Sequence, residues 1–157
     1  MHLENSIVIE ASPDIIFRLA AAIERWPEML PHYRRVRVLE QRGQQKLVKM
    51  AAQRDGLPVS WTSIQEPRPA EGRILFRHVG GVTRGMSVEW CLEPLDDGRT
   101  RVSIEHDFTP GWPLIGGRVA RLVIGELFVR NIAGKTLRRI KMLAEAEQAS
   151  QRRTRSA

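Results

Sequence analysis

Six runs of alternating apolar and polar residues follow one another between residues 33 and 109, and this succession limits the possible folds more than any other feature. Short turn-forming stretches, such as Asp96–Asp97–Gly98, separate the runs. The predicted strands span 33–42, 45–54, 57–66, 72–79, 83–95 and 99–109. Alternation indicates strands with one buried face, and separators this short join antiparallel neighbours. The pattern therefore predicts consecutive antiparallel hairpins.

One strand and two short helices are expected before these hairpins. Residues 3–10 alternate toward their end and predict a first strand. Ser12, Pro13 and Asp14 then supply an N-cap, a proline at the first helical position and an acid in the first turn. A helix should follow to about residue 23, and the proline-bounded stretch 26–31 predicts one further helical turn.

A long helix is predicted from residue 116 to about residue 147. Residues at helical spacing form one apolar face: Ile115, Val119, Leu122, Glu126, Val129, Ala133, Leu137, Ile140 and Ala144. One curved sheet packed around this helix is the expected architecture, with residues 1–149 as one domain and 150–157 as a basic, disordered tail. Ile124 and Phe128 lie on the outer side, where the first helix or a second subunit would cover them, so a monomer and a homodimer both remain open.

Charge and composition exclude several classes of protein. The net charge of +7 invites a nucleic-acid or ribosome interpretation, but most basic residues are scattered, and a solvated basic surface is preferred. No secretory leader or apolar run of about 20 residues is evident, so a cytoplasmic protein without a membrane span is expected. The four histidines and single cysteine lack metal-ligand spacing, so neither a metal nor a cofactor is predicted.

The inward faces of the predicted strands are aromatic and carry a few neutral polar groups. They contain Val59, Trp61, Ser63 and Gln65, then Ile74, Phe76 and His78, then Met86, Val88, Trp90 and Leu92, and finally Val102, Ile104, His106 and Phe108. Buried polar side chains need hydrogen-bond partners, and a purely structural core seldom contains so many of them. An apolar pocket with several convergent polar groups is typical of a small-molecule site.

The order of elements resembles the α+β helix-grip fold of START and Bet v 1-like proteins, in which about seven antiparallel strands curve around a long C-terminal helix. Several motifs are similar to those of bacterial polyketide aromatase/cyclases: Asn5-Ser6-Ile7-Val8-Ile9-Glu10-Ala11, Ile23-Glu24-Arg25-Trp26-Pro27-Glu28 followed by Tyr33, Trp61-Thr62-Ser63, His106-Asp107-Phe108 and Leu137-Arg138-Arg139-Ile140-Lys141. The similarity covers residues 3 to about 147. It implies an internal cavity that binds a poly-β-ketone and directs aldol ring closure and dehydration.

This resemblance also implies site residues. His106 matches a family histidine and is the expected general base, and Tyr33 matches a family tyrosine at the cavity mouth. The family arginine is replaced by Gln65, which would orient a carbonyl without supplying charge, and the family aspartate position falls at Lys135 or Thr136. The expected ligand-binding residues are Trp61, Ser63, Phe76, His78, Met86, Trp90, Phe108, Leu122 and Glu126.

Three functions stay open. The leading hypothesis is an enzyme like a polyketide cyclase, with an acyl carrier protein as a possible partner, and His106 and Tyr33 favour it. The alternative is a noncatalytic carrier of a quinone or lipid, which Gln65 favours. In the third, the basic surface binds ribosomes or nucleic acid, and binding would then be sensitive to salt.

Overall fold

A seven-stranded antiparallel sheet forms the body of the fold. The structure is a computed structural model that describes residues 2–54, 56–81, 83–108 and 130–156. The strands are β1 (His2–Ile9), β2 (Tyr33–Arg42), β3 (Gln45–Arg54), β4 (Leu57–Arg68), β5 (Arg73–Gly81), β6 (Ser87–Pro94) and β7 (Thr100–Asp107). Their order in the sheet is β1-β7-β6-β5-β4-β3-β2. From β2 to β7 each strand pairs with its successor, which confirms the predicted hairpins.

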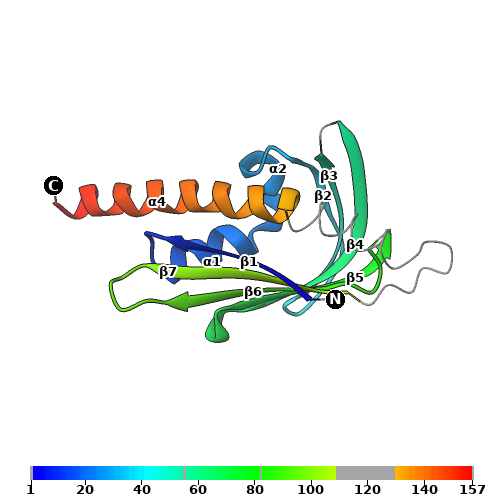
Figure 1. Ribbon diagram of the computed structural model, residues 1–157, viewed down its shortest axis with the longest axis horizontal. Helices are drawn as coiled ribbons and strands as arrows, with labels where there is room; N and C mark the ends of the chain where they lie inside the picture. Colours follow the sequence, from blue (N-terminus) through cyan, green and yellow to red (C-terminus); the bar gives the residue numbers. More distant parts are fainter. Residues whose placement is uncertain (1, 55, 82, 109–129, 157) are drawn as a thin grey trace.

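The helices lie on one side of this sheet (Figure 1). They are α1 (Pro13–Ala21), the 3-10 turn η1 (Ile23–Arg25), α2 (Trp26–Met29) and α4 (Gly134–Ser156), with a second 3-10 turn, η2 (Pro69–Glu71), between strands. Pro13 and Asp14 occupy the first turn of α1 as predicted, although the side chain of Ser12 makes no capping hydrogen bond. No described helix is both long and apolar enough to cross a membrane.

Helix α4 packs against α1 and β1 and closes the curved sheet, so the chain has the predicted α+β helix-grip fold. Its core side carries Leu137, Ile140 and Ala144. Polar contacts attach its middle to the chain around the end of β1. Lys141 Nζ donates to the carbonyl of Val8 at 3.0 Å, and Glu145 Oε2 accepts from the backbone N–H of Glu10 at 2.8 Å.

The end of α4 corrects one expectation. The stretch from residue 150, predicted as a disordered tail, continues the helix to Ser156 with exposed side chains. Basic residues in the last turn, Arg153 and Arg155, interact favourably with the negative end of the helix dipole. The first part of the predicted long helix, with Leu122 and Glu126, lies outside the described residues.

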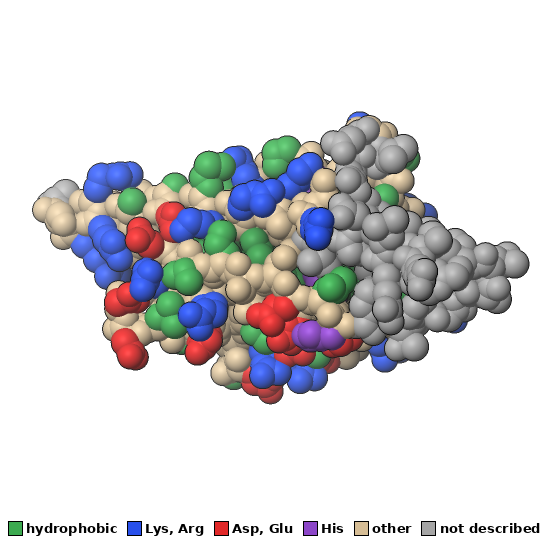
Figure 2. All heavy atoms as spheres, in the orientation of Figure 1, with side chains coloured by type: hydrophobic (Ala, Val, Ile, Leu, Met, Phe, Trp, Pro, Cys, Tyr) green, Lys and Arg blue, Asp and Glu red, His purple; other side chains and the backbone are tan. Residues whose placement is uncertain are grey.

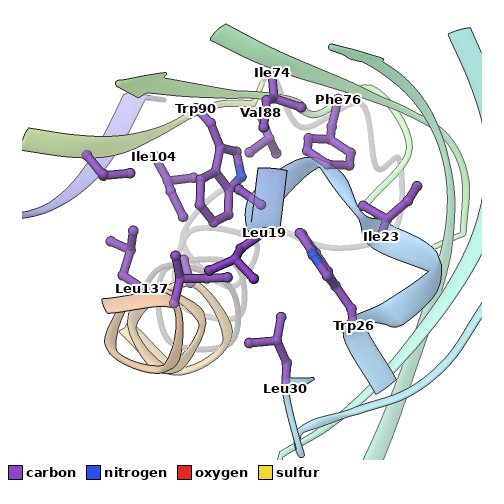
Figure 3. Packing of buried hydrophobic residues seen from close by; sticks show 14 of the residues in the cluster. Leu19, Ile23, Trp26, Leu30, Ile74, Phe76, Val88, Trp90, Ile104 and Leu137 are labelled. Atoms are coloured by element: carbon purple, nitrogen blue, oxygen red, sulfur yellow. The ribbon is translucent and has the colours of Figure 1, made fainter. Parts of the chain in front are cut away.

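Alternation correctly identified the buried face of the sheet. Side chains from β5, β6 and β7 point into a shared interior with those of α1, α2 and α4 (Figure 3). Among these strands the inward residues Ile74, Trp90 and Ile104 are almost fully buried, whereas the outward arginines Arg73 and Arg101 are exposed. The hydrophobic core is therefore the space between the concave face and the helices.

Two predicted boundaries around β5 are wrong. Gly80–Gly81, expected to be a turn, belongs to β5, where Gly81 pairs with Trp61. A Cβ atom on Gly81 would lie 2.7 Å from the carbonyl oxygen of Ser60, so glycine permits a close strand approach rather than a turn. The turn comes later, where the N–H of Met86 donates to the carbonyl of Thr83 at 3.0 Å, and β6 begins only at Ser87.

Gly81→Ala should lower the free energy of unfolding by about 2–4 kcal/mol, because it combines left-handed backbone strain with a steric clash. Gly85→Ala is the matched control: its φ of +96° is close to the +89° of Gly81, but a Cβ atom added there would meet nothing within 4 Å. The control should lose about 1 kcal/mol. Urea unfolding of both variants measures the difference, and equal losses would contradict the close-approach explanation.

Candidate functional site

A small cavity of about 50 Å³ lies between the concave face of the sheet and the start of α4. Aromatic and aliphatic side chains dominate its walls, and a few polar groups interrupt them. Its described lining consists of Trp26, Tyr33, Met50, Trp61, Phe76, His78, Val88, Trp90, Ile104, His106, Ile132, Ala133 and Thr136. The last three belong to the π-helical turn 130–133 and the first turn of α4.

Trp26 closes one wall of this cavity from the short helix α2. Its indole ring contacts the rings of Tyr33, Phe76 and Trp90 at centroid distances of 4.9, 6.1 and 6.1 Å. Figure 3 shows it facing the side chains of β5 and β6 across the interior. The side chain is 2% exposed, yet its Nε1 has no hydrogen-bond partner among the described residues. The cavity wall therefore contains an unused N–H donor.

His106 brings a second unused polar atom to the cavity from β7. The residue is 5% exposed, and within the described part of the chain its Nδ1 has no hydrogen-bond partner. Burial lowers the pKa of His106 to about 4, despite the opposing charge of Asp107. The imidazole is consequently neutral at pH 7 and can accept a proton.

His78 lies on the same cavity wall but is held firmly by its neighbours. Its ring stacks on the indole of Trp61, with centroids 5.7 Å apart and planes 3° from parallel. Its Nδ1 is 2.6 Å from the Thr83 hydroxyl. Burial, together with electrostatic interaction with His106, lowers the pKa of His78 to about 3.

A hydrogen-bonded group separates the cavity from the surface at the start of α4. The Thr136 hydroxyl donates to the carbonyl of Ile132 at 2.7 Å and lies 2.8 Å from His32 Nε2. Tyr33 also interacts with this hydroxyl, while burial raises the pKa of its phenol. The Thr136 hydroxyl has one proton and donates it to the carbonyl of Ile132. His32 and Tyr33 must therefore donate their hydrogen bonds to the Thr136 oxygen. The phenol of Tyr33 is thus directed toward α4.

The structure brings some of the predicted site residues together and not others. Tyr33, Trp61, Phe76, His78, Trp90 and His106 all line the cavity. Gln65 is fully buried outside this described lining, where its Nε2 donates to the carbonyl of Ala21 at 3.1 Å. Ser63 donates to the carbonyl of Arg77, and Met86 and Phe108 are buried elsewhere in the core. Leu122 and Glu126 lie outside the described residues.

Sequence reasoning did not assign Trp26, Met50, Ile132, Ala133 or Thr136 to the cavity. Met50 was detectable, because it alternates with the buried residues Val48 and Ala52. Trp26 was recognised only as part of a motif, and its contacts depend on strands that are distant in sequence. Thr136 has no sequence signal for its role as a shared acceptor.

A curved antiparallel sheet closed by a C-terminal helix, with an aromatic cavity between them, defines a helix-grip protein. The family profile described as "Polyketide cyclase / dehydrase and lipid transport" matches residues 9–135. The chain belongs to this family.

Individual relatives agree with this assignment. The chain is 30% identical over 108 residues to the granaticin polyketide synthase bifunctional cyclase/dehydratase of Streptomyces violaceoruber, which covers 68% of this chain and 33% of that protein. It therefore spans a third of that relative. The fold is similar to the Zhui aromatase/cyclase of Streptomyces sp. R1128, with a TM-score of 0.82, 24% identity and coverage of 92% and 93%. The fold is also similar to that of the di-domain aromatase/cyclase StfQ, with a TM-score of 0.75 and 20% sequence identity. The match covers 93% of this chain and 51% of StfQ.

Thr136→Val should lower the free energy of unfolding by about 1–3 kcal/mol, because it leaves the buried donors of His32 and Tyr33 without their shared acceptor. Thr154→Val on the same helix is the matched control, since its exposed hydroxyl also donates to a carbonyl four residues earlier. Its effect should stay within about 0.5 kcal/mol. Chemical denaturation measures both, and a Thr136→Val loss as small as that of the control would contradict the shared-acceptor geometry.

Stability should fall as the pH drops from 6.5 toward 4. The pKa values of His78 and His106, about 3 and about 4, lie below the ordinary value of 6.5, so the unfolded chain binds protons first in this range. The loss at pH 5 should be on the order of 1–2 kcal/mol per histidine. His106→Gln should therefore reduce the difference in unfolding free energy between pH 7 and pH 5. An unchanged difference would show that His106 titrates normally in the folded protein.

Proposed function

We propose that this protein binds a polyketide-type ligand in the cavity and promotes its aldol cyclisation and dehydration. One observation carries the proposal. Four buried side-chain atoms of the described residues have no hydrogen-bond partner, and two of them, Trp26 Nε1 and His106 Nδ1, belong to the lining of one cavity. Each unsatisfied group costs about 1–3 kcal/mol. A ligand that offers both a carbonyl acceptor and an acidic proton would satisfy the two atoms together.

A chain with carbonyl groups at alternate carbons has these properties. A base removes a proton from a methylene between two carbonyls, and the resulting enolate carbon attacks a second carbonyl of the same chain. The new carbon–carbon bond leaves an alkoxide, which takes up a proton to become a hydroxyl. Loss of a further proton and of hydroxide then gives a double bond and water.

His106 is the proposed base, with the neutral tautomer that leaves Nδ1 unprotonated. Its low pKa makes the imidazolium a strong acid once formed, so the proton passes readily to the alkoxide. The Trp26 N–H is the proposed donor to the ketone or enolate oxygen. Tyr33 is assigned to the Thr136 group, because its phenol interacts there. Gln65 is assigned to the end of α1, because its Nε2 donates to Ala21 and the residue lies outside the described cavity lining, although its Oε1 has no partner among the described residues.

Ligand binding requires the cavity to widen. A volume of 50 Å³ is close to that of one or two water molecules, whereas small-molecule sites have about 300–1,000 Å³. Ile132 and Ala133 lie on the π-helical turn before α4, a type of local distortion that occurs frequently at functional sites. Movement of this turn is the proposed route to a larger site. A substrate attached to an acyl carrier protein would enter through the same opening.

A noncatalytic carrier for a quinone or lipid is the second candidate. The specific observation in its favour is that no cationic side chain lines the described cavity, and that Gln65, the position where the resemblance predicts an arginine, turns its amide toward Ala21. A carrier would use the aromatic walls and leave the ligand unchanged.

His106→Gln should decrease the rate of cyclisation of a soluble poly-β-ketone by about 100-fold or more, because the amide cannot act as a base. Product formation is measured by chromatography, and substrate binding by quenching of tryptophan fluorescence. Binding should change much less than the rate, since the substitution retains a polar side chain.

His2→Gln is the matched control, since it makes the same change at an exposed histidine of β1. It should retain the wild-type rate. An equal rate in His106→Gln and wild type would eliminate His106 as the base. A wild-type protein that retains a quinone or lipid and never releases a cyclised product would instead establish the carrier.

A further inference from the structure

A second hollow lies outside the cavity, where the first turns of α4 face the β3–β4 hairpin. This cationic groove has a volume of about 680 Å³. Its described lining comes from three parts of the chain: Pro31 and His32 before β2, Gln53 and Gly56 at the hairpin, and Lys135, Arg138, Arg139 and Met142 on α4. The four α4 residues follow helical spacing and form one stripe, distinct from the core side of the helix.

The groove concentrates positive charge that no described residue neutralises through an ion pair. No carboxylate belongs to its described lining, and Lys135, Arg138 and Arg139 form no ion pair with any described residue. Elsewhere on the molecule cations are commonly paired, as Arg18 is with Glu147 and Arg73 with Glu89. Figure 2 shows Lys and Arg side chains gathered over the first part of α4.

One contact holds part of this charge in place, and one pKa shift shows that Lys135 and Arg138 act on the groove wall. Arg139 Nε donates to the carbonyl of Met29 at 2.9 Å, which fixes its guanidinium beside α2. The pKa of His32 is lowered to about 4, first by burial and then by the positive charges of Lys135 and Arg138. His32 is therefore neutral at pH 7 and adds no positive charge to the groove. An anion in the groove would be bound by Lys135, Arg138 and Arg139, which stay charged.

The groove adjoins the cavity. His32 lines the groove, Thr136 lines the cavity, and a single 2.8 Å hydrogen bond joins them. Exposed apolar surface continues from the cations, since Met142 is 53% exposed and Pro31 lies across from it in the same lining. A ligand that combines a strong anion with an apolar chain matches both features.

We propose that the cationic groove binds the phosphate ester of an organic ligand whose apolar chain lies toward the cavity. Guanidinium groups bind phosphate oxygens in a bidentate manner, and three cations suit a doubly charged group better than a single carboxylate. A lipid phosphate and the phosphate of a carrier-bound or cofactor-bound substrate share this chemistry. The idea that the ligand's apolar chain enters the cavity rests on the proposed function. The phosphate site in the groove does not depend on it.

Calorimetric titration of the wild-type protein tests the proposal with decyl phosphate, coenzyme A and inorganic phosphate, and with decanol as the uncharged counterpart. Decyl phosphate should bind at least about tenfold more tightly than decanol, and its affinity should fall with added salt. Tight binding of coenzyme A would identify a carrier-type source of the phosphate, and preference for decyl phosphate a lipid-type source.

Lys135→Glu and Arg138→Glu should each weaken binding of the preferred phosphate ester by about tenfold or more. Arg152→Glu is the matched control, because it makes the same charge change on the same helix about 21 Å away. It should have little effect. Arg139 is left intact, since its hydrogen bond to Met29 contributes to the fold.

Equal affinity for decyl phosphate and decanol would overturn the proposal, as would equal losses in Arg138→Glu and Arg152→Glu, which indicate only general attraction to a basic protein. If inorganic phosphate bound as tightly as both esters, the organic part of the ligand would contribute nothing to binding. Cyclisation by the wild type is measured separately on an uncharged ketone. Failure of the phosphate site and failure of the proposed enzyme are therefore distinguishable.

Discussion

The concave face of the sheet has to be covered, and the packing of Trp26 against it is the contact on which the rest of the structure depends. A strongly curved sheet collects large apolar side chains on its inner face, and leaving them in water would forfeit about 25 cal/mol for each Å² exposed. The single turn α2 inserts Trp26 among the rings of Tyr33, Phe76 and Trp90, which come from β2, β5 and β6. Helix α4 packs against α1 and β1 and adds Leu137, Ile140 and Ala144 to the core. The cavity lies between Trp26, the inner face of the sheet and the start of α4.

Burial then separates the polar groups of the interior into two kinds. Thr136, His32 and Tyr33 satisfy one another, and Gln65 Nε2 is satisfied by the carbonyl of Ala21, so these groups connect α4 and α1 to the sheet. Trp26 Nε1 and His106 Nδ1 have no such partners in the cavity. Since the packing around them contributes the stability, the fold can tolerate two unsatisfied atoms where a ligand is expected. A missing partner alone does not identify a functional atom, because Gln65 Oε1 also has none among the described residues. Trp26 Nε1 and His106 Nδ1 differ from it in that their residues line the cavity.

The sequence predicted the sheet well because its signals are local. A period of two reports which face of a strand is buried, and it placed Phe76, Trp90 and His106 on the inner face correctly. Features set by distant neighbours were not predictable. Gly81 resembles a turn residue until its close approach to Ser60 is known, and the amide of Gln65 has no preferred direction until Ala21 is placed beside it. Thr136 was noted only as the position of a missing acid, because an acceptor shared by two donors leaves no periodic pattern.

The distribution of charge connects the cavity with its surroundings. The described lining contains no permanently charged side chain, and burial keeps His78 and His106 neutral at pH 7. Such an interior strongly disfavours charged ligands, because an unpaired ion loses its hydration there. A neutral ketone or hydrocarbon chain has no such penalty. Any ligand that also carries a phosphate must keep that end outside, and the cationic groove is joined to the cavity by the hydrogen bond between His32 and Thr136. The same burial that keeps His106 neutral therefore determines which end of an amphipathic ligand can enter.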